Sequence, residues 1–149
     1  MGTGFSTVYG QTENCPVITL HHINDNIDDI CNTAGQPVSQ TEVSIRSVDA
    51  NQAVDIGVVG EICARGPCVM LGYNDNPKAT SETVDAEGWL HTGDLGQMDA
   101  RGYVTITGRV KEMIIRGGEN HFPKEIENCL LEHPDVAEVA VVGLPDEKW

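Results

Sequence analysis

The 149-residue sequence predicts a mixed α/β fold in which strands predominate. Two observations carry this prediction. Between residues 37 and 108, short alternating or apolar segments follow one another and are bounded by Gly, Asp or Asn, as is typical of strands. After residue 109, a strand-like segment precedes an amphipathic helix, and a second strand-like segment follows it. The composition, 40% hydrophobic and 21% charged, is that of a globular protein.

Three strands and one short helix are expected in the first part of the chain. Thr41–Val48 alternates between apolar and polar residues, whereas Val58–Ala64 and Gly102–Ile106 are short apolar runs. Asp99–Gly102 is expected to form a hairpin turn, because glycine tolerates a positive φ. Asn76–Pro77 combines an N-cap residue with a proline suited to the first helical turn, so a short helix is expected to begin there.

The second part of the chain is expected to form a strand, a helix and another strand. Glu112–Arg116 is strand-like, and Gly117–Gly118 interrupts it. Mostly apolar side chains recur at helical spacing within Pro123–His133, and the proline that follows ends this helix. Val136–Val142 is apolar and rich in valine, so we expect a buried strand there.

The charge distribution excludes some classes of partner. Acidic residues outnumber basic ones 23 to 9, and the formal net charge is −14, so nucleic acid is excluded as a general partner. An anionic membrane surface is disfavoured for the same reason, and no apolar run approaches the ~20 residues of a membrane span. Five basic residues cluster between residues 101 and 124; they form either a local anion site or a solvated hairpin and helix start.

The cysteines and histidines give no pattern typical of a metal site. The five cysteines are scattered without a Cys-x-x-Cys pair, which indicates reduced thiols and a cytoplasmic location. Cys63 and Cys68 are expected to be thiols at a strand end rather than ligands. No two histidines have the i, i+4 spacing of a zinc-binding helix, and His91 is expected to have a packing role.

Four motifs occur in a characteristic order: Tyr9–Glu13 (Tyr-Gly-Gln-Thr-Glu), Gly88–Asp94 (Gly-Trp-Leu-His-Thr-Gly-Asp), Gly108–Lys111 (Gly-Arg-Val-Lys) and Arg116–Ile126. In this order and at these separations, they resemble the adenylate-forming (AMP-binding) enzyme family. That family includes acyl-CoA synthetases, firefly-type luciferases and the adenylation domains of peptide synthetases. Three further segments resemble its short- and medium-chain acyl-CoA synthetase branch: Glu13–Pro16, Cys68–Tyr73 and Ile114–Asn120.

The resemblance implies an architecture and a reaction. Residues 1–108 would be the C-terminal part of a large AMP-binding domain with a distorted, β-barrel-like end, and residues 109–149 the hinge and first part of a small α/β domain. The parent enzyme would be a ligase of fatty acid metabolism. It would use ATP and Mg²⁺ to convert a small-molecule carboxylate into an acyl-adenylate, then transfer the acyl group to CoA and release AMP.

The resemblance also assigns nucleotide contacts. Asp94 would accept hydrogen bonds from the ribose hydroxyls, and Arg109 would contact ribose and phosphate through its fork of donors. Tyr9 and Gly10 would sandwich the adenine, with the glycine permitting close approach of the backbone. Plain structural roles stay open, namely an Asx-turn for Asp94 and core packing for Tyr9.

Five further residues receive roles in catalysis, domain movement or CoA binding. Thr12 and Glu13 would be catalytic, with Thr12 near the α-phosphate and Glu13 as the Mg²⁺ ligand. Lys111 would be the hinge between the two domains, or else an exposed loop lysine. Gly117 and Gly118 would let the CoA thiol arm pass close to the backbone, and a strand-breaking turn is compatible with that role.

Two elements of the family pattern have no counterpart in the sequence. The Ser/Thr/Gly-rich phosphate loop and the catalytic lysine in a Gly-Lys loop are both missing, so we expect an excerpt of a longer enzyme that is inactive alone. One alternative is an adenylation domain that loads a carrier protein instead of CoA. Another is a non-enzymatic truncated product that at most binds nucleotide. A homo-oligomer is possible in either case.

Overall fold

The computed structural model describes residues 5–146. Nine strands, three α-helices and two 3-10 turns occur in this range, in an order that mixes both types of structure as the sequence predicts. Their bounds are β1 Val8–Tyr9, η1 Thr12–Asn14, β2 Thr19–Leu20, α1 Ile27–Asn32, β3 Gln36–Pro37, β4 Glu42–Arg46, β5 Gly60–Arg65, α2 Pro77–Thr83, β6 Leu90–Met98, β7 Val104–Arg109, η2 Val110–Glu112, β8 Ile114–Arg116, β9 Glu119–His121 and α3 Pro123–Leu131.

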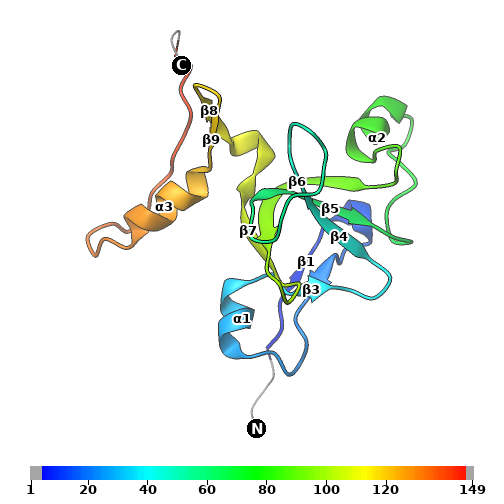
Figure 1. The fold of residues 1–149 in the computed structure, drawn as a ribbon, viewed down its shortest axis with the longest axis horizontal. Helices are drawn as coiled ribbons and strands as arrows, with labels where there is room; N and C mark the ends of the chain where they lie inside the picture. Colours follow the sequence, from blue (N-terminus) through cyan, green and yellow to red (C-terminus); the bar gives the residue numbers. More distant parts are fainter. Residues whose placement is uncertain (1–4, 147–149) are drawn as a thin grey trace.

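The described strands form three separate sheets. The largest is an antiparallel sheet of order β4-β5-β6-β7, which forms the centre of the molecule (Figure 1). A smaller antiparallel sheet of order β1-β2-β3 and the hairpin β8-β9 complete the set. Within the described range the largest sheet is open, with β4 and β7 at its two edges, so "β-barrel-like" describes it only loosely.

The hydrophobic core lies against the central sheet. Ile45, Ile62 and Val104 are buried there, and Tyr9 packs against them from the small sheet. The three strands expected in the first part of the chain are confirmed as β4, β5 and β7, and the expected short helix is confirmed as α2. The Asn76 side chain caps α2 by accepting the backbone N–H of Ala79.

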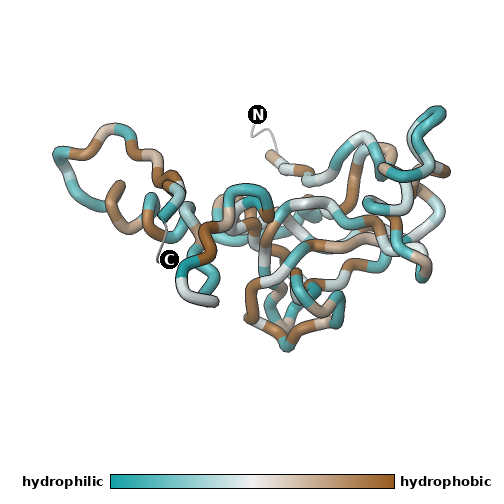
Figure 2. The backbone as a smooth tube through the Cα atoms, turned by 90° about the horizontal axis from the view of Figure 1, so that it is seen from above, coloured by the Kyte–Doolittle hydropathy of each residue, from teal (hydrophilic) through white to brown (hydrophobic). Residues whose placement is uncertain are grey.

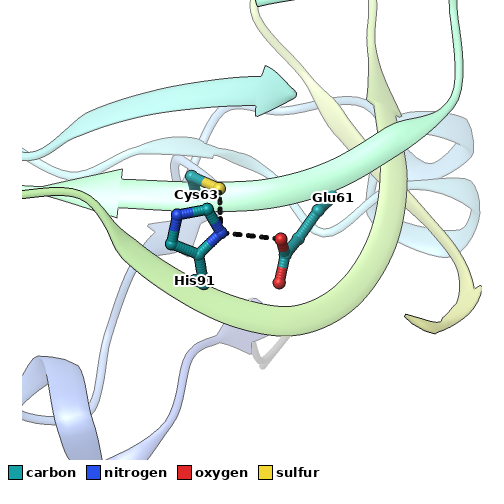
Figure 3. A group of neighbouring side chains, drawn as sticks. All are labelled: Glu61, Cys63 and His91. Carbon is teal, nitrogen blue, oxygen red and sulfur yellow. Dashed lines mark hydrogen bonds and ion pairs between the residues drawn. The ribbon is translucent and has the colours of Figure 1, made fainter. Parts of the chain in front are cut away.

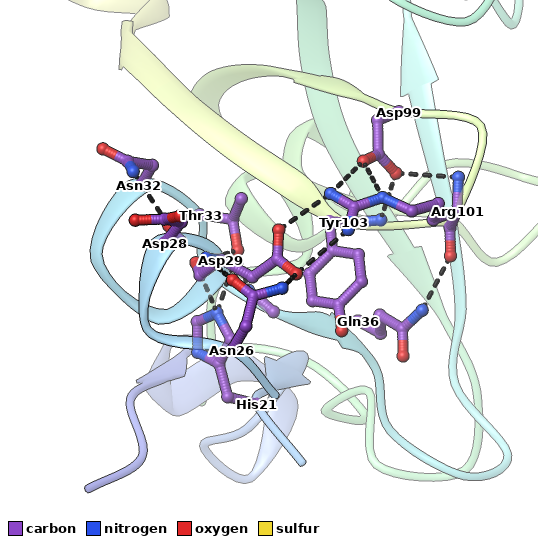
Figure 4. Close-up of polar contacts among 11 residues, drawn as sticks. His21, Asn26, Asp28, Asp29, Asn32, Thr33, Gln36, Asp99, Arg101 and Tyr103 are labelled. Carbon is purple, nitrogen blue, oxygen red and sulfur yellow. Dashed lines mark hydrogen bonds and ion pairs between the residues drawn. The ribbon is translucent and has the colours of Figure 1, made fainter. Parts of the chain in front are cut away.

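The turn between β6 and β7 also forms where it was expected, and it holds α1 in place. In this turn Gly102 has a φ of +85° and donates its N–H to the Asp99 carbonyl. Arg101 reaches from the same turn to both carboxylate oxygens of Asp29 on α1, at 2.8 and 2.9 Å, and it also pairs with Asp99 (Figure 4). A bidentate guanidinium–carboxylate pair fixes orientation as well as distance, so α1 is tied to the central sheet.

The segment after β7 stands apart from the central sheet (Figures 1 and 2). It contains the short hairpin β8-β9, and the positive φ of Gly117 and Gly118 closes that hairpin. The expected helix is confirmed as α3, although it ends at Leu131 rather than His133.

The buried strand expected at Val136–Val142 is wrong, because this segment is not part of any described sheet. The backbone N–H of Val141 donates to the Glu127 carboxylate at 3.0 Å instead of joining a strand ladder. Val142 is also 72% exposed. A valine-rich segment becomes a strand only where another backbone edge is available to pair with it.

None of the helices in the part of the chain that the structure describes is long and apolar enough to cross a membrane. All five cysteines lie in that part and are unpaired thiols. Cys63 is buried and the other four are exposed.

Candidate functional site

A cavity of about 680 Å³ lies between the β6-β7 end of the central sheet and α3. Four of the predicted site residues line it, namely Tyr9, Gly10, Asp94 and Arg109. They come from three parts of the sequence, and the fold places them around one cavity. Residues of α3, among them Lys124 and Glu127, form the opposite wall.

Asp94 lies at the centre of the polar contacts in this cavity. The Tyr9 hydroxyl donates to Asp94 Oδ2 at 2.9 Å, although the two residues are 85 positions apart in the sequence. Arg109 Nε lies 3.2 Å from Asp94 Oδ1, and the two residues are paired across β6 and β7. The Asp94 side chain is 13% exposed and that of Arg109 is 68% exposed. The aspartate is therefore held in a shielded place, while the arginine extends toward solvent.

Burial raises the pKa of Tyr9 well above its ordinary value, and the neighbouring Asp94 charge acts in the same direction. The Tyr9 hydroxyl therefore stays protonated at neutral pH. It serves as a donor to the carboxylate.

The backbone around Asp94 departs from a regular strand. Gly93 has a φ of +74°, which favours glycine. The Thr92 hydroxyl accepts the N–H of Asp94 at 3.1 Å and donates to the Ile62 carbonyl on β5 at 2.7 Å. The Asx-turn that was left open for Asp94 is not found in this segment. The local side-chain contact is instead made by Thr92, whose hydroxyl accepts the Asp94 N–H.

Gly10 is required by packing within the chain itself. A Cβ built at this position would overlap the carbonyl oxygen of Pro16. Any residue with a Cβ would therefore push the two backbone segments apart. The absence of a side chain at Gly10 leaves its backbone exposed at the cavity wall.

Glu13 lies outside the large cavity. It lines a smaller cavity of about 340 Å³ with Lys111 and Thr92, and its Oε1 accepts the Tyr73 hydroxyl at 2.8 Å. Among the described residues, Glu13 Oε2 makes no hydrogen bond or ion pair, so one carboxylate oxygen is left for a metal ion. A single carboxylate suits Mg²⁺, which usually keeps several waters and is otherwise held by substrate phosphates. Thr12 is exposed and lines neither cavity.

The three remaining predicted residues lie beyond β7. Lys111 is in η2, the short turn that joins β7 to β8, and it is exposed. Gly117 and Gly118 form the tip of the β8-β9 hairpin and do not line the large cavity. The structure thus places Lys111 and Glu13 at the same smaller cavity, whereas Gly117 and Gly118 line neither cavity.

Sequence analysis missed one polar cluster beside the site. Glu61, Cys63 and His91 lie together on β5 and β6 (Figure 3). His91 Nδ1 is 2.7 Å from Glu61 Oε2 and 3.6 Å from Cys63 Sγ. His91 therefore has polar contacts beyond the packing role expected for it, and Cys63 is a buried thiol within β5. The alternation of side chains along a strand could have placed Glu61 and Cys63 on one face.

Comparisons with known proteins show what this chain is similar to. Residues 1–74 match the AMP-binding enzyme family, and residues 125–149 match the C-terminal domain of AMP-binding enzymes. YngI of Bacillus subtilis, an acyl-CoA synthetase by its name, is 49% identical over 141 residues, which are 95% of this chain and 26% of YngI. The mitochondrial medium-chain acyl-CoA ligase ACSF2 of Homo sapiens is 43% identical over 140 residues, which are 94% of this chain and 23% of that protein.

Among solved structures, ATP-bound MatB from Rhodopseudomonas palustris superimposes with a TM-score of 0.88. The two are 33% identical, and the match covers 99% of this chain and 29% of MatB. This chain therefore spans about a quarter of the length of the relatives it matches.

Proposed function

Because the chain belongs to the family of AMP-binding, adenylate-forming enzymes, we propose that it holds the nucleotide of an ATP-dependent acyl-CoA synthetase in the cavity around Asp94. The observation that carries the proposal is the convergence of Tyr9, Asp94 and Arg109 at that cavity. Its volume of about 680 Å³ is within the range of small-molecule sites.

The proposed reaction has two halves. First, a carboxylate oxygen attacks the α-phosphorus of ATP, which forms an acyl-adenylate and breaks the bond to pyrophosphate. The sulfur of CoA then attacks the acyl carbon, AMP leaves, and the thiol proton passes to solvent. Both halves depend on holding a nucleotide in one orientation, because positioning contributes most of the acceleration in such transfers.

Asp94 has the free capacity that ribose binding needs. An ionised carboxylate offers about four lone-pair sites, and Tyr9 and Arg109 use one on each oxygen. One site on each oxygen is left for the two vicinal hydroxyls of a ribose. The exposed Arg109 guanidinium keeps donors for a phosphate, while the ring of Tyr9 forms part of the wall for the adenine.

Glu13 is the proposed holder of Mg²⁺, through the carboxylate oxygen that Tyr73 does not engage. When bound, Mg²⁺ would neutralise charge that develops on the phosphates. Thr12 precedes Glu13 in the same turn and is proposed to lie near the α-phosphate.

The second half of the reaction is proposed to involve the segment after β7. Residues 1–108 and 109–149 are proposed to be parts of two domains that rotate about Lys111, since η2 separates the central sheet from the β8-β9 hairpin. Such a rotation would carry Gly117 and Gly118 toward the site, where they would border the CoA thiol arm. A cytoplasmic location and a homo-oligomer stay predictions of the sequence.

Titration of the chain with AMP, followed by backbone amide NMR, tests the proposal. We expect shifts at Gly10, Asp94 and Arg109, and we expect Asp94→Ala to weaken AMP binding about 10- to 150-fold through loss of charge-assisted hydrogen bonds. Asp49→Ala removes the same charge from an exposed turn and should bind AMP as the wild type does. Equal binding by Asp94→Ala and the wild type would refute the assignment of this cavity.

A further inference from the structure

The carboxylate of Glu61 joins β5 to the irregular segment of β6. Its Oε1 accepts the backbone N–H of Gly93 at 2.9 Å, and its Oε2 accepts the Nδ1–H of His91 at 2.7 Å. The Glu61 side chain is only 12% exposed. Both of its oxygens therefore have partners on β6, one on each side of Thr92.

Gly93 lies where the pairing of β5 with β6 is irregular. On one side of it Cys63 pairs with His91, on the other Glu61 pairs with Leu95, and the register shifts between these two pairs. Between these two pairs Ile62 stands opposite three residues of β6, Thr92–Asp94, which therefore form a bulge. A shielded N–H without a partner is costly, and the Glu61 carboxylate supplies that partner.

The contacts of this bulge lead directly to Asp94. Thr92 bonds both the N–H of Asp94 and the carbonyl of Ile62, next to Glu61 on β5. The backbone of Asp94 is thus linked to β5 through Thr92, and its carboxylate is held by Tyr9 and Arg109.

We propose that Glu61 is a positioning residue: by binding the Gly93 N–H, it holds the Thr92–Asp94 bulge so that both Asp94 oxygens face the nucleotide cavity. The effect of Glu61 on nucleotide binding rests on the proposed function, but its effect on the bulge can be measured without nucleotide.

A metal ion is the main competing explanation of the cluster. Glu61, Cys63 and His91 offer three ligand atoms within 4.8 Å of one another. His91 Nδ1, however, carries the proton that it donates to Glu61 Oε2, so it has no lone pair for a metal ion, and burial raises the pKa of the Cys63 thiol to about 12, which favours the protonated thiol over the thiolate that metals bind. Hydrogen bonds from His91 and Gly93 account for both oxygens of the Glu61 carboxylate.

Amide hydrogen exchange of the whole 149-residue chain, read by NMR, is the first test. In Glu61→Ala we expect Gly93 to exchange about 10- to 100-fold faster, while Cys63 and Leu90 keep their protection. Glu61→Gln should restore most of the Gly93 protection, because its amide oxygen can still accept the N–H. Glu82→Ala is the matched control, since Glu61 and Glu82 both line the cavity of about 340 Å³, but Glu82 forms an ion pair with Lys78 and not with the bulge.

The second readout is AMP affinity, which should fall about 10- to 100-fold in Glu61→Ala, recover in Glu61→Gln and stay unchanged in Glu82→Ala. Unchanged Gly93 exchange in Glu61→Ala would overturn the inference, as would an equal loss of protection at Gly93, Cys63 and Leu90, which would mark a general stability role. Protection of Gly93 that rises on addition of Zn²⁺ and is lost in Cys63→Ser would overturn it in favour of a metal site. A wild-type chain that does not bind AMP would refute the proposed function, while the exchange data would still decide the role of Glu61.

Discussion

Replacing Tyr9 with Phe removes one hydroxyl and keeps the ring that packs against the core. The hydroxyl donates to a carboxylate that is 13% exposed, so the bond lost is a charge-assisted bond in a shielded place. Bonds of this kind contribute about 1.5–3 kcal/mol. The Arg109 partner, 68% exposed and screened by solvent, offers little compensation. We expect Tyr9→Phe to lower the free energy of unfolding by about 1.5–3 kcal/mol at neutral pH.

The same variant has a signature at alkaline pH. The pKa of Tyr9 is raised in the folded chain, so its stabilising contribution is complete below the unfolded pKa of about 10 and is lost as pH rises toward the folded value. Above about pH 10 the stability of the wild type should therefore fall more steeply than that of Tyr9→Phe, by at most about 1.4 kcal/mol per pH unit. Other groups that titrate in this range contribute equally to both proteins.

Urea denaturation followed by circular dichroism, repeated between about pH 7 and pH 11, measures both effects. Tyr73→Phe is the matched control, because the Tyr73 hydroxyl also donates to a carboxylate but Tyr73 is 39% exposed. That variant should lose less than about 1 kcal/mol. If the two variants lose equal stability, or if Tyr9→Phe has the same slope as the wild type above pH 10, the hydroxyl does not make the shielded bond described here.

Three further predictions concern the backbone, the tie to α1 and the hinge. Gly10→Ala should be destabilised by about 1–3 kcal/mol or more in thermal unfolding, whereas Gly108→Ala, where an added Cβ meets nothing within 4 Å, should not; equal effects would contradict the packing argument. Asp29→Asn should be less stable than the wild type at neutral pH, because hydrogen bonds from Arg101 lower the pKa of Asp29. This contribution to stability is present above the unfolded pKa of about 4, so the difference in stability between the two proteins should shrink as the pH falls through and below that value. A difference that stays constant with pH would contradict the role of the Asp29 charge. In a full-length relative that carries this segment, Lys111→Pro should leave pyrophosphate release near normal and block thioester formation, because proline fixes φ; single-turnover assays that show equal slowing of both steps would rule out a hinge.

The sequence predicts best where a local pattern decides the structure. The N-cap of α2 and the turn at Asp99–Gly102 follow from residue types whose conformational preferences act over four positions. Strand β6, by contrast, has the sequence Leu-His-Thr-Gly-Asp-Leu-Gly-Gln-Met, with two glycines and few β-branched residues. It forms because β5 and β7 pair with it on both sides, and no local pattern reveals that.

The same contrast applies to the two helices at either end of the chain. In α1, the sequence Ile-Asp-Asp-Ile-Cys-Asn has no long apolar period; Asn26 caps the helix locally, and Arg101 pairs with Asp29 from across the molecule. In α3 the apolar period is plain, yet Ile126 and Leu130 are 42% and 44% exposed. Periodicity therefore identified the helix without showing what its apolar face contacts.

The site itself shows where motif analysis ends. The resemblance to the adenylate-forming family assigned Tyr9, Asp94 and Arg109 to one predicted nucleotide site. Glu61 faces the backbone of the motif instead, and its contact with Gly93 depends on a register shift between two strands. The orientation of a binding aspartate depends on the hydrogen bonds that hold the backbone N–H groups around it. Variation at Glu61 should therefore alter the orientation of Asp94 without changing the amino acid at any motif position.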